Sequence, residues 1–413
     1  MAQTQAAAWL AVPADHPFGL ETLPYGSFTT ADRPAQPRTG VAIGAHVLDL
    51  SAATARLLPG RAHLFSSGTL DAFLAAGHGA WAQVRAALVH WLSRDTFRAA
   101  LEDLLVPVPE ARLQLPFTVA DYVDFYASEH HASNVGRIFR PDAADPLTPN
   151  WRHLPIGYHG RAGTVMVSGT PVRRPRGQVR PSGGAAGPGF GPTARLDFEA
   201  ELGFVVGVPS QPGEPVPAGK FAEHVFGVCI VNDWSARDIQ SWEYIPLGPF
   251  LSKSFGTTVS PWIVPLAALA HARVRPPSRD TELLPYLTES ADWGLDIAYE
   301  VRINEHVVSR PPYATMHWSP AQMLAHLTVN GATLRTGDLY ASGTVSGPQP
   351  DQRGSLIELG WNGQEPISLP DGTSRAWLRD GDEVVIAASA RGPDGTRIGL
   401  GEARGQVAPA IAR

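Results

Sequence analysis

Short apolar runs, some alternating and some continuous, recur along most of the chain and are separated by turn residues. The 413 residues include 41 glycines and 38 prolines, which interrupt these runs at short intervals. Such spacing is typical of β-strands joined by tight turns. Residues 70–105 are the exception, since they are rich in alanine and leucine and have helical periodicity. The pattern therefore predicts mostly β structure with some α-helix.

The continuous apolar run over residues 225–231 predicts a buried strand. Asn232 or Asp233 is a natural cap for a following helix, which should end before Pro246. At 3.6 residues per turn, four polar residues share one face of this helix within roughly 60°: Asp233, Arg237, Gln240 and Tyr244. A solvated ion pair between the first two is the alternative. The following segment favours a site, because Lys253 is its only charge among aromatic residues, glycines and prolines.

A second pattern places acidic residues at every other position between residues 196 and 204, which predicts a strand with one acidic face. Asp197, Glu199 and Glu201 would lie only ~7 Å apart along that face. If the face is buried, a cation or protonation must relieve the repulsion. The alternative is a two-sided strand whose acidic face lies in solvent. Together with Asp233, the pattern favours a divalent cation, and oxygen-only ligands indicate Mg²⁺ or Ca²⁺.

A third polar segment, residues 121–140, contains Asp124 as a possible fourth oxygen ligand and two adjacent histidines. Histidine is the side chain whose ordinary pKa suits proton abstraction at neutral pH. His130 and His131 could each be a base, a metal ligand or a capped loop residue. For His159, which follows in a glycine-bounded turn, a structural role is the default expectation.

Composition restricts the function classes. With 44% hydrophobic residues the chain can bury a large core, and its length suggests two or three domains, with a boundary near Pro116. A net charge of −6 gives no electrostatic footprint for nucleic acid or anionic membrane. The single cysteine, Cys229, lies in the apolar run 225–231 and fits a core position in a reducing cytoplasm. We expect neither a secretory signal nor a membrane span.

Several motifs together resemble the fumarylacetoacetase family. They include DYVDFYASEHHASNVG, TPNWRHLPIGYHGR, VSGTPVRRPRGQ, RLDFEAEL, FGVCIVNDWSARDIQSWEYIPLGPFLSKSFGTTVSPW, VNGATLRTGDLYASGTVSG, GSLIELGW and LRDGDEV, and the resemblance extends over most of the chain after about residue 118. PFGLETLPYGSF carries a looser resemblance near the N-terminus. The resemblance implies an SH3-like β-barrel domain with a helical linker over residues 1–117. It also implies a catalytic, metal-binding mixed β-roll domain over residues 118–413, and a homodimer.

The resemblance also implies roles, position by position. The calcium ligands would be Asp124, Glu199, Glu201 and Asp233, with Lys253 and Thr257 at a neighbouring magnesium-associated position. His131 would be the general base, Glu358 would orient it, and Arg237, Gln240 and Lys253 would stabilise developing negative charge. The substrate-contacting residues would be Tyr126, Arg140, Tyr158, Gln240, Tyr244 and Thr344.

The implied activity is hydrolytic cleavage of a carbon–carbon bond in a 3,5-diketo acid, 4-fumarylacetoacetate, which yields fumarate and acetoacetate at the end of tyrosine and phenylalanine catabolism. One alternative is a related acylpyruvate hydrolase, or a hydratase, isomerase or decarboxylase acting on 2-oxo acids. Such enzymes generally lack the long N-terminal domain and the pairing of His131 with Glu358. A calcium-stabilised binding protein without enzymatic activity is the third hypothesis.

Overall fold

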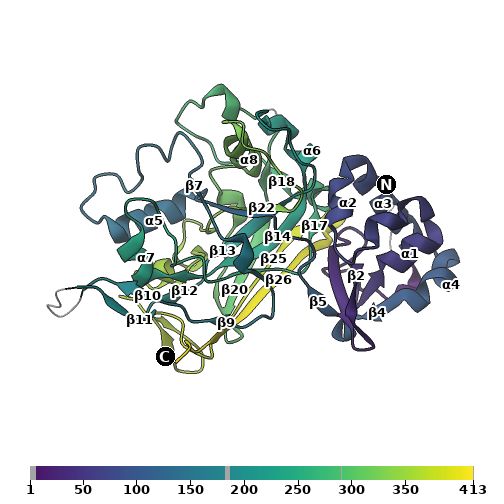
Figure 1. Ribbon diagram of the computed structural model, residues 1–413, viewed down its shortest axis with the longest axis horizontal. Coiled ribbons are helices and arrows are strands. Elements are labelled where there is room, and N and C mark those ends of the chain that lie inside the picture. Colours follow the sequence, from purple (N-terminus) through teal and green to yellow (C-terminus); the bar gives the residue numbers. More distant parts are fainter. Residues whose placement is uncertain (1–5, 182–186, 290, 413) are drawn as a thin grey trace.

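The computed structural model describes residues 6–181, 187–289 and 291–412. Its N-terminal part forms the lobe at the right of Figure 1 and contains a five-stranded sheet of order β4-β3-β2-β1-β5. These strands are β1 (Tyr25–Thr30), β2 (Arg33–Ile43), β3 (His46–Asp49), β4 (Leu105–Pro107) and β5 (Arg112–Gln114). The helices beside them are α1 (Leu50–Leu57), α2 (Asp71–Ala75), α3 (Gly77–Leu92) and α4 (Arg98–Leu101). The predicted helical stretch over residues 70–105 is thus confirmed for most of its length.

The described residues after the N-terminal lobe are built on two larger sheets. The first is eight-stranded, in the order β7-β6-β22-β13-β14-β16-β8, with β17 also paired to β14. Its strands are β6 (Asp121–Phe125), β7 (Gly157–His159), β8 (Val165–Val167), β13 (Ala200–Val206), β14 (Val225–Asp233), β16 (Thr257–Val259), β17 (Val264–Pro265) and β22 (Asp338–Ala341). Every residue of β14 is buried, which confirms the interior strand predicted over residues 225–231.

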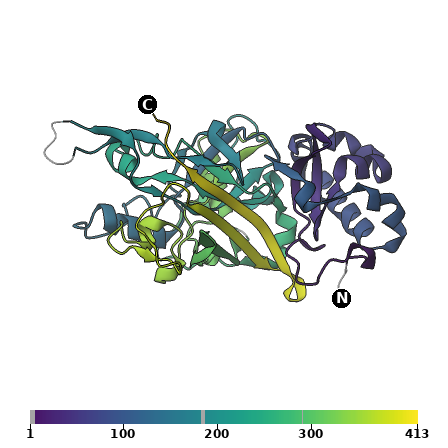
Figure 2. The same cartoon turned by 90° about the horizontal axis from the view of Figure 1, so that it is seen from below.

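The second sheet has the order β21-β20-β25-β26-β9. It comprises β9 (Val172–Arg173), β20 (Ile297–Ile303), β21 (His306–Ser309), β25 (Glu383–Arg391) and β26 (Arg397–Ala408). Figure 2 shows β25 and β26 as a long hairpin whose turn reaches the N-terminal segment. There the Gly399 amide donates to the carbonyl oxygen of Pro17 at 2.8 Å.

Smaller elements surround these sheets. In the part of the chain that the structure describes, the two-stranded pairs are β10 (Arg176–Val179) with β11 (Gly189–Pro192), β12 (Leu196–Asp197) with β15 (Ser235–Ala236), β18 (Arg273–Val274) with β19 (Gly294–Leu295), and β23 (Ile367–Ser368) with β24 (Ser374–Arg375). The remaining α-helices of the described residues are α5 (Glu129–Phe139), α6 (Phe221–His224), α7 (Arg237–Glu243), α8 (Pro320–Thr328) and α9 (Leu356–Leu359). Among the described residues, no helix combines the length and apolar character needed to cross a bilayer.

Aromatic side chains join the N-terminal lobe to the eight-stranded sheet. The ring of Phe226, in β14, lies 5.4 Å from those of Tyr25 and Phe73 and 5.2 Å from that of Trp81. Burial of large aromatic side chains contributes strongly to stability. Cys229 lies in the same cluster and is fully buried, and burial raises the pKa of its thiol to about 12. The N-terminal lobe therefore supports one face of the sheet that carries the candidate site.

Candidate functional site

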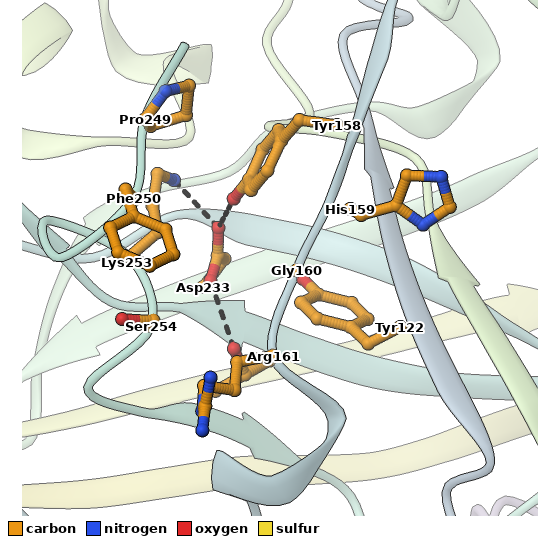
Figure 3. Close-up of a pocket in the computed structure, with 11 residues that line it drawn as sticks. Tyr122, Tyr158, His159, Gly160, Arg161, Asp233, Pro249, Phe250, Lys253 and Ser254 are labelled. Carbon is orange, nitrogen blue, oxygen red and sulfur yellow. Dashed lines mark hydrogen bonds and ion pairs between the residues drawn. The ribbon is translucent and has the colours of Figure 1, made fainter. Parts of the chain in front are cut away.

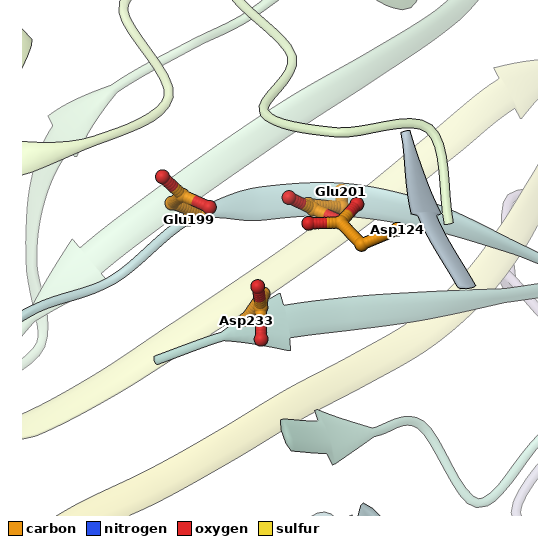
Figure 4. A group of neighbouring side chains, drawn as sticks. All are labelled: Asp124, Glu199, Glu201 and Asp233. Atoms are coloured by element: carbon orange, nitrogen blue, oxygen red, sulfur yellow. The ribbon is translucent and has the colours of Figure 1, made fainter. Parts of the chain in front are cut away.

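Four buried carboxylates meet at one end of the eight-stranded sheet (Figure 4). Asp124 lies in β6, Glu201 in β13 and Asp233 at the end of β14, while Glu199 directly precedes β13. One oxygen of each lies within 4.8 Å of the corresponding oxygens of the others. Antiparallel pairing of β13 with β14 sets Ala200 opposite Asn232, which brings Glu199 beside Asp233. The structure thus brings together the four predicted cation ligands, and their burial excludes a solvated acidic face.

The predicted helix beginning after Asn232 or Asp233 is wrong in its start. Asp233 is the last residue of β14, where it pairs with Thr257 of β16, and α7 begins only at Arg237. Residues 235 and 236 remain extended because β15 pairs with β12. Asp233 therefore reaches the site from a strand rather than from a shared helix face. The expected end of the helix before Pro246 is confirmed, since α7 ends at Glu243.

The single acidic strand predicted over residues 196–204 is also wrong in detail. It is divided into β12 and β13, and Glu199 makes an isolated bridge to Ser355 between them. Glu199 and Glu201 join the carboxylate cluster, whereas Asp197 does not. Asp197 instead accepts a hydrogen bond from Arg237 Nε at 2.8 Å. A specific partner therefore neutralises this third acidic residue.

Two buried basic side chains, Arg237 and Lys253, lie against the carboxylate cluster. Arg237 Nη2 donates to Glu199 Oε1 at 2.7 Å, and Lys253 Nζ donates to Asp233 Oδ2 at 2.7 Å and to Glu199 Oε2. Figure 3 shows Lys253 and Tyr158 pointing at Asp233, whose Oδ2 also accepts from Tyr158 Oη at 2.8 Å. Thr257 Oγ1 donates to Asp233 Oδ1 at 3.1 Å. Glu199 and Asp233 are thus well supplied with donors.

The other two carboxylates have no such support. Asp124 Oδ1 and both oxygens of Glu201 are buried without a hydrogen-bond partner in residues 6–181, 187–289 and 291–412. Burial, followed by neighbouring negative charge, raises the pKa of both carboxyls well above its usual range. Burial alone would also raise the pKa of Glu199, but Lys253 and Arg237 outweigh it and lower that pKa. Unpartnered carboxylate oxygens facing one another fit a hard divalent cation, because such ions take oxygen ligands.

A histidine–carboxylate pair lies next to the cluster. His131, in the first turn of α5, places Nδ1 2.6 Å from Glu358 Oε2 and Nε2 3.9 Å from Glu199 Oε1. Ser128 caps α5 by accepting a hydrogen bond from the amide of His131 at 3.2 Å. Burial would raise the pKa of Glu358, but His131 and the surrounding donors outweigh this and lower it. The predicted His131–Glu358 pair is therefore in contact, and one ring nitrogen is left for the cavity.

Three further side chains that the sequence did not indicate hold Glu358. Asn134 Nδ2 donates to Oε1 at 3.0 Å, and the hydroxyls of Ser346 and Ser355 donate to Oε2 at 3.0 and 2.7 Å. Asn134 lies three residues after His131 in α5, so helical spacing could have revealed it. Ser355 is the N-cap of α9 and lies three residues before Glu358, so the S-x-x-E spacing typical of a helix start could have revealed it. Ser346 carries no comparable local signal.

A cavity of about 420 Å³ opens beside these groups. It is lined by all six predicted substrate-contacting residues: Tyr126, Arg140, Tyr158, Gln240, Tyr244 and Thr344. His131, Arg237, Lys253, Asp124 and Glu199 line it as well. Thr257 and His159 instead line a smaller neighbouring cavity of about 80 Å³, which Lys253 and Tyr158 also reach (Figure 3). His130 is half-buried and lines neither cavity.

Both parts of the chain match models of known protein families. Residues 21–116 match the family model described as Fumarylacetoacetase N-terminal, and residues 121–408 match Fumarylacetoacetate (FAA) hydrolase C-terminal. The chain is 45% identical to the fumarylacetoacetases of Rattus norvegicus and Homo sapiens, with 98% of this chain and 99% of each relative covered. For the fumarylacetoacetase of Arabidopsis thaliana the identity is 44%, over 97% of this chain and 98% of the relative.

Solved structures share the fold at lower identity. A fumarylacetoacetate hydrolase from Exiguobacterium antarcticum superposes with a TM-score of 0.54 at 18% identity, covering 94% of this chain and 99% of that chain. A maleylpyruvate hydrolase from Sphingobium sp. SYK-6, solved with manganese(II) and pyruvate, gives a TM-score of 0.51 at 16% identity, covering 94% and 100%.

Proposed function

The chain belongs to the fumarylacetoacetase family, and we propose that it hydrolyses 4-fumarylacetoacetate to fumarate and acetoacetate. One observation carries this proposal: Asp124 and Glu199 of the buried oxygen cluster line the same cavity as His131, whose Nδ1 contacts Glu358. A protein that bound a cation only for stability would have no use for a held imidazole at that position.

Asp124, Glu199, Glu201 and Asp233 would hold Ca²⁺ or Mg²⁺, with Lys253 and Thr257 at the neighbouring magnesium-associated position. The unpartnered oxygens of Asp124 and Glu201 support this assignment, since buried carboxylates need compensation. When bound, such an ion polarises carbonyl oxygens and orients a chelating substrate.

His131 is proposed as the general base. In the tautomer that pairs with Glu358, Nδ1–H donates to the carboxylate, which leaves Nε2 free to accept a proton from water. Glu358 then stabilises the imidazolium that forms, and its lowered pKa keeps it ionised for that purpose. The resulting hydroxide attacks the substrate carbonyl, and the carbon–carbon bond breaks to release the carbanion of acetoacetate, which must be protonated.

Negative charge develops on the attacked oxygen and on the leaving group, so the cavity needs hydrogen-bond donors and positively charged side chains. Arg237 and Lys253 line it and are held rigidly by buried carboxylates. Gln240 Oε1 accepts from Arg237 Nη1 at 3.1 Å, which leaves the amide nitrogen of Gln240 available to donate. In comparable sites one such donor contributes about 3 kcal/mol to the transition state.

The remaining cavity residues are proposed to position the substrate. Arg140 can bind a terminal carboxylate through its forked guanidinium, and its Nη2 now donates to the carbonyl oxygen of Pro146 at 2.8 Å. Tyr126, Tyr244 and Thr344 line the same cavity and offer hydroxyls, whereas the hydroxyl of Tyr158 donates to Asp233 Oδ2 and can only accept from a ligand. Thr344 Oγ1 is buried and has no partner within the described residues, so it is available to a ligand.

The test is loss of the ultraviolet absorbance of the diketone after purified protein is mixed with fumarylacetoacetate, with and without Mg²⁺ or Ca²⁺. Acylpyruvates and 2-oxo acids are tested in parallel. We expect cation-dependent loss with a preference for fumarylacetoacetate. A preference for acylpyruvates would instead favour the related hydrolase of this superfamily.

Three further properties are proposed from the family relationship: a homodimer, a cytoplasmic location and a place in tyrosine and phenylalanine catabolism. Light scattering of the purified protein tests the first, since a monomeric mass at working concentrations contradicts it. Localisation of a tagged chain tests the second. Accumulation of fumarylacetoacetate in cells that lack the protein tests the third.

A further inference from the structure

Asp197 is the one member of the acidic pattern that lies outside the carboxylate cluster, and it is completely buried. Its Oδ2 accepts from Arg237 Nε at 2.8 Å. The same guanidinium donates through Nη2 to Glu199 Oε1 at 2.7 Å. Arg237 therefore stands between two carboxylates, of which Glu199 belongs to the cluster and Asp197 does not.

Besides a bond from the amide of Phe198 to Oδ1 at 2.7 Å, Asp197 has two contacts that lead towards the His131–Glu358 pair. Its Oδ1 accepts from the amide of Leu356 at 2.7 Å, and its Oδ2 accepts from the amide of Ile357 at 3.0 Å. These amides belong to the first residues of α9, the short helix that carries Glu358. Since the first amides of a helix have no partner within it, a side-chain acceptor fixes where the helix begins.

We propose that Asp197 is a positioning residue that ties the two halves of the site together, by holding Arg237 against Glu199 and holding α9 so that Glu358 meets His131. It does not line the cavity, so it acts through these neighbours rather than on the substrate. The effect of Asp197 on turnover rests on the proposed function, whereas its effect on cation binding does not.

The substitution Asp197→Asn tests the proposal at nearly constant volume. Its amide oxygen can keep the bond from Leu356, but its NH₂ group would face the donors of Arg237 and Ile357. Two donors cannot form a hydrogen bond with each other, so Arg237 loses its bond to residue 197. Its guanidinium then interacts more strongly with Glu199, where it competes with the bound cation. Substitutions in the shell behind metal ligands typically reduce affinity or activity about 10- to 100-fold.

The matched control disrupts a second buried Asp–Arg ion pair, which lies outside the candidate site. Asp382 forms a buried two-bond ion pair with Arg375, at 2.8 Å for each bond, and lines neither cavity. Asp382→Asn should lower the unfolding midpoint at least as much as Asp197→Asn, while kcat and cation affinity stay at wild-type values. A purely structural role for Asp197 would make the two variants alike.

Three measurements decide the matter. Calorimetric titration of the metal-free protein with Ca²⁺ or Mg²⁺ should show affinity at least about 10-fold weaker in Asp197→Asn. At saturating cation, kcat should fall about 10- to 100-fold while KM changes less than about threefold. In a double-mutant cycle with Glu358→Gln, Asp197→Asn should lower kcat less than it does alone, because both act on the same histidine.

Wild-type cation affinity in Asp197→Asn, unchanged kcat at saturation, or strictly multiplicative effects in the cycle would each overturn the proposal. If Asp197→Asn does not fold, Asp197→Ser, which keeps one acceptor without charge, replaces it under the same criteria. If the wild-type protein fails to cleave fumarylacetoacetate, the proposed function fails, and the cation titration still tests Asp197. The kinetic arm then uses the diketo acid that the wild-type protein does cleave.

Discussion

Cation binding to the metal-free protein should release protons, and the structure identifies their source. Asp124 and Glu201 are buried, face each other and have oxygens without a partner among the described residues. Burial, with the neighbouring negative charges, raises the pKa of each carboxyl well above its usual range. The metal-free pair therefore holds its protons to a higher pH than ordinary carboxyls do, and the two groups titrate as a coupled unit.

Cation affinity should depend on pH, because protons and the divalent ion compete for the same carboxylates. A divalent ion binds the deprotonated carboxylates, so each retained proton must leave as the ion enters. Raising the pH removes the competitor and strengthens binding by about tenfold, or about 1.4 kcal/mol, per pH unit for each displaced proton. We therefore expect the cation affinity to rise with pH throughout the range in which the pair titrates, which extends above the usual range of carboxyl groups.

The assay is calorimetric titration of metal-free protein at one pH in two buffers of different ionisation enthalpy. The difference in apparent heat gives the number of protons released. Glu201→Gln removes one of the two titrating groups and should reduce that number, whereas Asp382→Asn should leave it unchanged. Equal heats in both buffers, together with an affinity that does not depend on pH, would refute the reasoning.

Other substitutions give further tests. His131→Ala should lower kcat about 10²- to 10⁴-fold in steady-state kinetics with substrate affinity largely retained, whereas His130→Ala, outside both cavities, should not. Glu199→Ala should lose calorimetric cation binding and turnover together, so activity without bound cation would contradict its place in the cluster. Burial, helped by Arg279, lowers the pKa of His317 from 6.5 to about 3. Because the unfolded chain takes up this proton first, stability should fall by about 2 kcal/mol between pH 6.5 and pH 5, and His317→Phe should remove that dependence in urea unfolding.

The local sequence pattern predicted the structure correctly wherever a single strand or short motif determines it. The apolar run 225–231 is a buried strand, and the alternation of Glu199 with Glu201 brings both carboxylates to the same cluster. Residues 70–105 are largely helical as predicted. These features depend on side-chain periodicity, which a single segment carries by itself. The SH3-like barrel, the β-roll and the boundary between residues 117 and 118 remain predictions from the family.

The errors arose where a distant segment overrides a local preference. Asn232 and Asp233 are good helix caps, yet pairing with β16 and β12 keeps the chain extended until Arg237. Asp197 follows the same alternation as Glu199, but its partners Arg237 and α9 lie far along the chain. Pairing between distant strands is set by the tertiary fold, so propensity within one window could not reveal it.

Glu199 is the point at which the two halves of the site meet. Its Oε1 accepts from Arg237 and lies 3.9 Å from His131 Nε2, while its Oε2 accepts from Lys253. The same carboxylate therefore belongs to the carboxylate cluster and lies against both Arg237 and His131. Changes at any of these neighbours alter the charge that Glu199 presents to the others, so their effects on turnover should not multiply independently. A site built this way depends on its supporting residues as much as on the groups that touch substrate.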